Sequence, residues 1–179
     1  MVTVAIMIII DNRLYSAGIF IDLSKVFDMV DYLILLSKLE HYGICGMPLE
    51  WFQNYLSSRQ HFGSINGESS NKLPVTCGVP QVSILGPLLF LSYINDIASS
   101  SKFLQFILFA DDTNLFMSSN NMEDLQQKLI SDLAGLSCWF KANKLSLNLD
   151  ETSYMLFSGK GNRVPIANFS LHIDNTIIK

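Results

Sequence analysis

The sequence has few charged residues, few prolines and no linker. Charged residues make up 16% of the 179 positions and proline occupies 5 of them, whereas soluble domains usually carry about 25% charged residues. Hydrophobic residues reach 49%, so the chain can bury a core and intrinsic disorder is excluded. Because no repeat and no Pro-rich or Ser-rich stretch divides the chain, we expect one domain over residues 1–179.

Long hydrophobic runs are also absent. The apolar run over residues 1–10 is shorter than the roughly 20 residues that a membrane-spanning helix needs, and no Lys or Arg precedes it as in a signal peptide. A second apolar stretch, residues 84–97, is interrupted by Gly86, Pro87 and Asn95. We therefore expect no membrane partner and an intracellular location, either nuclear or cytoplasmic.

Cysteine and positive charge are scarce as well. The 3 cysteines, Cys45, Cys77 and Cys138, have no C-x-x-C spacing, which supports neither a disulfide framework nor a zinc site and favours a reducing compartment. Lys and Arg total 12 against 16 Asp and Glu, for a net charge of -4. This balance argues against a simple basic patch for nucleic acid, but it leaves an acidic catalytic centre open.

Hydrophobic periodicity predicts alternating strands and helices in the first half. Ala17–Asp22 is an apolar run that ends in a carboxylate, which is typical of a buried strand. Apolar residues at helical spacing predict a helix over about 30–42 and a second helix that begins near Pro48. Residues 60–65 alternate like a strand, and Asn66-Gly67 is a hairpin turn signal.

In the second half, a loop over residues 76–83 leads into an apolar helix that reaches about residue 97. Two apolar runs, 103–109 and 113–117, flank Asp111 and Asp112, so we expect a β-hairpin with an acidic tip.

The last elements complete an α+β pattern. Asn120 or Asn121 is expected to cap a long helix, whose inward residues are Leu125, Leu129, Leu133, Leu136 and Phe140. Residues 154–157 and 169–173 have the composition of two more strands.

The acidic tip points to metal chemistry. The adjacent carboxylates of Asp111 and Asp112 repel each other, and apolar neighbours add a desolvation cost, so a cation should compensate them. If the strand that ends at Asp22 lies beside the hairpin, three carboxylates converge, which is enough for two divalent cations about 4 Å apart. On spacing alone, however, an Asp-Asp pair is more often a solvated turn.

Four phrases that occur in order resemble the reverse-transcriptase domain of non-LTR retrotransposons. They are Phe20-Ile-Asp-Leu-Ser-Lys-Val-Phe-Asp28, Gly78-Val-Pro-Gln-Val-Ser-Ile-Leu-Gly-Pro-Leu-Leu-Phe90, Phe109-Ala-Asp-Asp112 and Asn143-Lys-Leu-Ser-Leu-Asn148. One phrase alone carries little weight, but four in sequence across most of the chain are specific.

The resemblance implies a polymerase palm with its core at about residues 17–158, an antiparallel sheet and helices packed on one face. It implies Asp22, Asp111 and Asp112 as catalytic carboxylates and metal ligands, with Mg²⁺ or Mn²⁺ as the cofactor. The implied reaction is RNA-directed DNA synthesis: two metal ions assist nucleotidyl transfer from a dNTP to the 3′-hydroxyl of a DNA primer on an RNA template.

The same resemblance implies the substrate-binding residues. Backbone N–H groups would bind the triphosphate along Leu23, Ser24, Lys25 and Val26. Phe27 would lie under the sugar and leave no room for a 2′-hydroxyl. The template strand and the new base pair would be positioned by Pro80, Gln81 and Ser83. Without the resemblance, Phe27 is equally a core residue, and the 80–83 segment is a Pro-kinked connector with a helix cap.

The sequence departs from the family pattern at three positions. Val82 replaces a glycine, Glu151 replaces a lysine that would face the pyrophosphate, and Tyr32 replaces a histidine. We also expect the fingers and thumb segments of the full-length element protein to be largely missing, and the isolated fragment to be inactive.

Two other functions stay open. The chain could be a catalytically dead retrotransposon remnant that acts at most as a nucleic-acid- or protein-binding module, which Val82 and Glu151 favour. A glycosidase with paired carboxylates would need a sugar cleft between groups about 5–9.5 Å apart, and nothing else in the sequence indicates one.

Overall fold

The computed structural model describes residues 14–57, 59–80, 83–109, 112–158 and 169–178. The chain packs into two compact units, one formed by residues 1–24 and 96–179 and the other by residues 25–95. The expectation of one domain over the whole chain stays a prediction.

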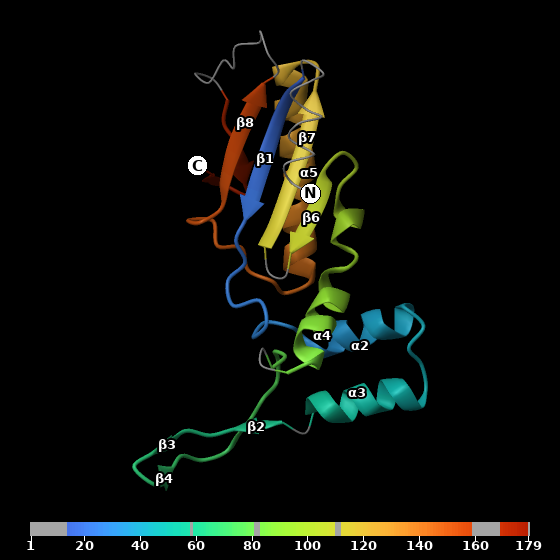
Figure 1. Ribbon diagram of the computed structural model, residues 1–179, viewed down its shortest axis with the longest axis vertical. Coiled ribbons are helices and arrows are strands. Elements are labelled where there is room, and N and C mark those ends of the chain that lie inside the picture. The colour runs from blue at the N-terminus through green and yellow to red at the C-terminus, as the bar shows by residue number, and fades with distance from the viewer. Residues whose placement is uncertain (1–13, 58, 81–82, 110–111, 159–168, 179) are drawn as a thin grey trace. The chain divides into compact units, whose positions relative to one another are not determined.

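The first unit contains a sheet of four antiparallel strands. Its order is β6 (Gln105–Phe109), β7 (Asp112–Ser119), β1 (Tyr15–Ile21) and β8 (Ser153–Ser158). Strand β1, the first in the described part of the chain, therefore lies between two strands from the second half of the sequence (Figure 1). This arrangement confirms the predicted hairpin and the α+β class.

Helix α5 (Met122–Ala142) packs against β1 and β7 and runs along one face of the sheet (Figure 1). Its inward side is the predicted one, since at most 1% of each side chain is exposed at Leu125, Leu129, Leu133, Leu136 and Phe140. Burial of such aliphatic and aromatic side chains, at about 1.5–3 kcal/mol each, holds the helix on the sheet.

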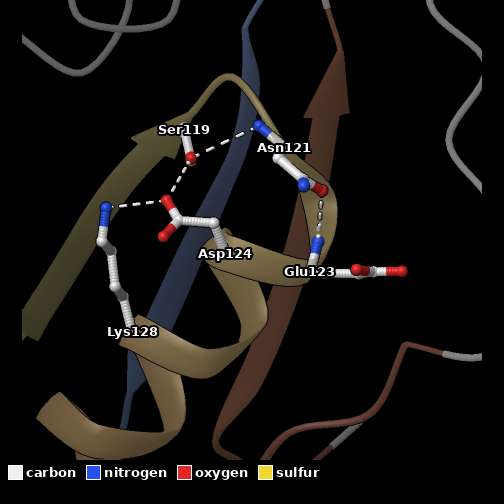
Figure 2. Close-up of polar contacts among 5 residues, drawn as sticks. All are labelled: Ser119, Asn121, Glu123, Asp124 and Lys128. Atoms are coloured by element: carbon white, nitrogen blue, oxygen red, sulfur yellow. Dashed lines mark hydrogen bonds and ion pairs between the residues drawn. The ribbon is translucent and has the colours of Figure 1, made fainter.

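Polar contacts at the first turn fix where α5 begins (Figure 2). The side chain of Asn121 accepts a hydrogen bond of 2.9 Å from the Glu123 N–H, which confirms Asn121 as the cap. The Asp124 carboxylate accepts hydrogen bonds from Lys128 at 2.7 Å and from Ser119 at 2.6 Å. These two bonds, that of Lys128 first, lower the pKa of Asp124.

A buried carboxylate on α5 anchors the loop before β6. Asp132 is 5% exposed and accepts hydrogen bonds from the Phe103 N–H at 2.9 Å, from the Leu104 N–H at 3.2 Å and from the Ser101 hydroxyl. This loop follows the short 3₁₀ helix η1 (Ile97–Ser100). Donated hydrogen bonds offset the cost of burying the carboxylate.

The C-terminal hairpin of β9 (His172–Ile173) and β10 (Thr176–Ile177) also contacts α5. Asp174 in its turn accepts hydrogen bonds from Lys141 at 2.6 Å and from Ser137 at 2.8 Å. Of the predicted strand over residues 169–173, only the last two residues form one, because the pairing with β10 covers no more.

The described part of the second unit contains three helices, α2 (Tyr32–His41), α3 (Met47–Ser57) and α4 (Leu85–Ile94). Helix α2 packs against both α3 and α4. The helix predicted to reach residue 97 ends at Ile94. No helix in the described part of the chain is both long and apolar enough to cross a membrane.

The prediction of one continuous strand over residues 60–65 is wrong. The segment is split into β2 (Gln60–His61) and β3 (Ser64–Ile65), which pair with β5 (Leu73–Pro74) and β4 (Glu68–Ser69) respectively. The break falls at Gly63, whose N–H donates to the Ser70 hydroxyl at 2.9 Å instead of to a strand. The predicted Asn66-Gly67 turn is present, and both residues have positive φ.

Candidate metal and nucleotide site

The C-terminal end of β1 and the start of β7 meet at one edge of the sheet. Ile21 pairs with Thr113, so the residues just beyond this pair, Asp22 and Asp112, come to the same pocket. The pocket has a volume of about 220 Å³ and is lined by Phe20, Ile21, Asp22, Asp112, Asn114 and Glu151. The structure therefore brings together two of the three predicted carboxylates. Asp111 lies outside the described residues.

Asn148 holds Asp22 in place. The Asn148 side-chain amide donates a hydrogen bond of 2.8 Å to Oδ2 of Asp22, and its backbone N–H donates one of 3.0 Å to the Asp22 carbonyl. No sequence pattern indicated a role for Asn148. The available signal was its place at the end of a family phrase, but the phrase does not say which residue it contacts.

A tight turn after Asn148 carries Glu151 to the pocket. The hydroxyl and the N–H of Thr152 donate to the Asn148 carbonyl at 2.8 and 3.0 Å, and the Asp22 N–H donates to the Thr152 hydroxyl at 3.4 Å. Thr152 is 1% exposed, so this buried residue anchors the turn. Glu151, which replaces the lysine expected from the family resemblance, thus lines the same pocket as Asp22 and Asp112.

The chemistry of the pocket fits a hard divalent cation. Carboxylate and amide oxygens are the ligands that Mg²⁺ and Mn²⁺ prefer, and Mg²⁺ usually takes only one or two carboxylates together with waters and phosphates. Asp22 and Asp112 supply two. Among the described residues, which exclude Asp111, no group of three or more His, Cys, Asp or Glu is placed to hold a metal by itself.

The residues that follow Asp22 are well anchored. The Leu23 side chain is 7% exposed, and its backbone pairs with Leu147 as an isolated bridge. The Ser24 N–H donates to the Ser146 carbonyl at 3.2 Å. A phosphate that takes the Ser24 amide must therefore displace an existing hydrogen bond.

In the second unit, Lys25, Val26 and Phe27 belong to a turn. Lys25 is exposed and has a φ of 47°, and Val26 is 3% exposed. The Phe27 carbonyl accepts a hydrogen bond of 2.6 Å from the Val79 N–H. The Phe27 ring packs on that of Phe90, with 4.9 Å between ring centroids. The proposed sugar-contacting residue is thus linked by its backbone to the loop that carries Pro80.

Gly78 joins this turn to the 76–83 loop. Its φ is +87°, and a Cβ there would lie 2.8 Å from backbone atoms of Asp28, so only glycine fits. The Gly78 carbonyl accepts hydrogen bonds from Arg59 at 2.8 Å and from the Tyr32 hydroxyl at 2.9 Å. Burial raises the pKa of Tyr32 above its ordinary 10.0, while Arg59 acts in the opposite direction.

Pro80 and Ser83 make local contacts. The Ser83 hydroxyl donates to the Pro80 carbonyl at 2.8 Å and accepts from the Gly86 N–H at 2.9 Å, so it satisfies the first turn of α4 as a helix cap does. These contacts agree with the alternative interpretation of this segment as a Pro-kinked connector with a helix cap. The role of Pro80 and Ser83 in positioning a template stays a prediction. Gln81 and Val82 lie outside the described residues.

Comparison with known proteins identifies the family. Residues 6–171 match the family described as Reverse transcriptase (RNA-dependent DNA polymerase). The chain is 28% identical over 163 residues to the probable RNA-directed DNA polymerase from transposon BS of Drosophila melanogaster, across 84% of this chain and 17% of that protein. It is 24% identical over 165 residues to the RNA-directed DNA polymerase from mobile element jockey of the same organism, across 87% of this chain and 18% of that protein.

A solved structure shows the same fold. The apo telomerase of Candida tropicalis, truncated from its C-terminal domain, matches with a TM-score of 0.61 and 12% identity over 91% of this chain and 35% of that chain. At this identity the match concerns the fold, and it confirms the α+β palm-like architecture. The family match over residues 6–171 shows that this chain belongs to the reverse transcriptase family, and its transposon relatives confirm the predicted resemblance to the non-LTR members.

Proposed function

We propose that this chain is the palm of an RNA-directed DNA polymerase and that its pocket at the edge of the sheet is the nucleotidyl-transfer centre. The observation that carries this proposal is the convergence of Asp22 and Asp112 on one pocket from strands far apart in the sequence. The chain spans only 17% and 18% of two curated relatives, so the activity and partners of the whole protein belong to this proposal as well.

Each part of the chain has a distinct task in this proposal. Asp22 and Asp112, with Asp111, hold Mg²⁺ or Mn²⁺, and the bound metals supply activation of the primer 3′-hydroxyl and stabilisation of the leaving pyrophosphate. The backbone at residues 23–26 donates amide hydrogen bonds to the dNTP, for which the Ser24 N–H exchanges its bond to the Ser146 carbonyl for one to a phosphate, and Phe27 excludes the 2′-hydroxyl of a ribonucleotide. The segment Pro80–Ser83 positions the RNA template against the DNA primer.

The proposed setting is intracellular, nuclear or cytoplasmic. The 3 cysteines are all free and exposed, which agrees with a reducing compartment.

The experiment that tests the metal centre is thermal unfolding of the purified chain with and without Mg²⁺ or Mn²⁺. A cation that binds only the folded state at 100 times its Kd stabilises that state by about 2.7 kcal/mol, so the melting temperature should rise. We expect Asp22→Asn and Asp112→Asn to remove most of the rise. Asp124→Asn is the matched control, since it removes one carboxylate near the other end of β7 and should keep the rise. Equal rises in all variants would refute a metal centre here.

The position of Glu151 favours a second candidate, a remnant that binds nucleic acid without turnover. The six described residues that line the pocket include no Lys or Arg, and Glu151 adds a third carboxylate that repels a triphosphate. In this case the chain should bind an RNA template annealed to a DNA primer, measured by fluorescence anisotropy, and add no nucleotide from dNTPs with Mg²⁺ or Mn²⁺. Primer extension by the unmodified chain would exclude this candidate.

A further inference from the structure

Asn148 contacts Asp22 through two different groups. Its backbone N–H donates to the Asp22 carbonyl at 3.0 Å, while its side-chain amide donates to Oδ2 of the Asp22 carboxylate at 2.8 Å. The two residues are 126 positions apart in the sequence. Such a side-chain contact fixes the plane of the carboxylate, which is otherwise free to rotate about its side-chain bonds.

We propose that Asn148 is the positioning residue for the metal-binding carboxylate of Asp22, a role that rests on the proposed metal centre. The amide uses one lone pair of Oδ2 and leaves the other carboxylate lone pairs for a cation. A carboxylate that is already oriented loses less conformational entropy when it binds a metal. Hydrogen bonds from outer residues to metal-ligating carboxylates act in this way, and their loss typically weakens metal binding about 10–100-fold.

The surrounding contacts separate this role from a purely structural one. The backbone N–H of Asn148 binds Asp22, and its carbonyl accepts from both the hydroxyl and the N–H of Thr152. None of these bonds uses the Asn148 side chain. Asn148→Ala therefore keeps the bonds of the turn and removes only the contact with the carboxylate.

The test measures Mn²⁺ affinity of the whole chain by the electron paramagnetic resonance signal of free Mn²⁺. We expect Asn148→Ala to raise the Kd about 10-fold. The matched control is Asn143→Ala, because the Asn143 amide also donates a hydrogen bond of 2.8 Å, here to the Trp139 carbonyl at the end of α5. This control should lower stability to a similar extent and leave the Kd within about twofold. Equal Kd changes in the two variants would overturn the proposal.

Two further variants distinguish failure of this inference from failure of the metal centre. If Asp22→Asn and Asp112→Asn both leave the Kd unchanged, the metal centre itself is wrong. If both weaken binding and Asn148→Ala does not, only the positioning role is wrong.

Combining the substitutions tests the route by which Asn148 acts. We expect Asn148→Ala to weaken Mn²⁺ binding further in an Asp112→Asn chain, where the Asp22 carboxylate is intact, and to have no added effect in an Asp22→Asn chain. A loss of similar size in both backgrounds would show that Asn148 acts through the general stability of the turn.

Discussion

Glu151 gives the pocket a charge that can be changed without altering the core. Its side chain lines the same pocket as Asp22 and Asp112 and is exposed, so Glu151→Gln and Glu151→Lys should both fold. The first removes a negative charge and the second reverses it. Both should weaken the binding of Mn²⁺, and the second should strengthen the binding of pyrophosphate.

The size of the pocket sets the expected change in Mn²⁺ affinity. A sphere of about 220 Å³ is about 7 Å across, and a divalent cation about 7 Å from a carboxylate in a water-like medium gains about 1 kcal/mol. Since about 1.4 kcal/mol corresponds to a factor of ten in affinity, Glu151→Gln should raise the Kd for Mn²⁺ about fivefold. Glu151→Lys doubles the change in charge and should raise the Kd roughly 25-fold.

The assay is a Mn²⁺ titration at two ionic strengths. The Debye length falls from about 30 Å at 0.01 M salt to about 3 Å at 1 M salt, so the effect should be present at low salt and largely lost at high salt. The control is Glu123→Gln, which changes the net charge equally at the other end of β7, a strand of 8 residues and thus roughly 25 Å long. If Glu151→Gln and Glu123→Gln change the Kd equally at low salt, the electrostatic reasoning is refuted.

Three other predictions concern stability. Asp132→Ala removes the carboxylate that accepts from the Phe103 and Leu104 N–H groups, and we expect a loss of about 1–3 kcal/mol in urea unfolding; an unchanged midpoint would contradict it. Gly78→Ala places a Cβ 2.8 Å from the Asp28 backbone and should cost more than about 1 kcal/mol, measured in the same way. Hydrogen bonds from Lys141 and Ser137 lower the pKa of Asp174 from 3.8, so their stabilisation is complete above pH 3.8 and is lost as the pH falls through the lower folded pKa. Thermal unfolding of Asp174→Asn and of the unmodified chain should therefore differ at pH 5 and converge at low pH, and a constant difference would contradict the assignment.

Local elements could be predicted where one physical pattern dominates. Helix α5 combines a 3.6-residue repeat of buried leucines with an asparagine cap, and both its face and its start were predicted correctly. Strand β1 was predicted because a short apolar run that ends in a carboxylate is typical of a buried strand. In contrast, polar and apolar residues alternate over residues 60–65 as in one strand, but the segment includes Gly63. Alternation gives no information on where the pairing partner changes from β5 to β4.

The pairing of distant strands could not be predicted from periodicity. Strand β1 pairs with β7 and β8, whose partner residues lie 92 to 104 and 133 to 143 positions later in the sequence. The entropic cost of loop closure rises only slowly with loop length, so separation along the chain does not single out the partners, and no local pattern specifies them. The family phrases supplied the expectation that Asp22 meets the acidic tip. The structure adds the register, with Ile21 opposite Thr113, that brings Asp22 to the same pocket as Asp112.

Within the pocket, the turn over residues 148–152 shows which features of a site a sequence can reveal. The effect of Glu151 was visible beforehand, because a charge is a property of the residue type and acts over several ångströms without exact orientation. The effect of Asn148 was not visible, because a neutral amide acts only through a hydrogen bond of defined length and direction. Asn143 has the same chemical group and uses it to bind the Trp139 carbonyl at the end of a helix. Two asparagines in one phrase thus have different tasks, and only the partner atoms, Oδ2 of Asp22 in one case and a helix carbonyl in the other, distinguish them.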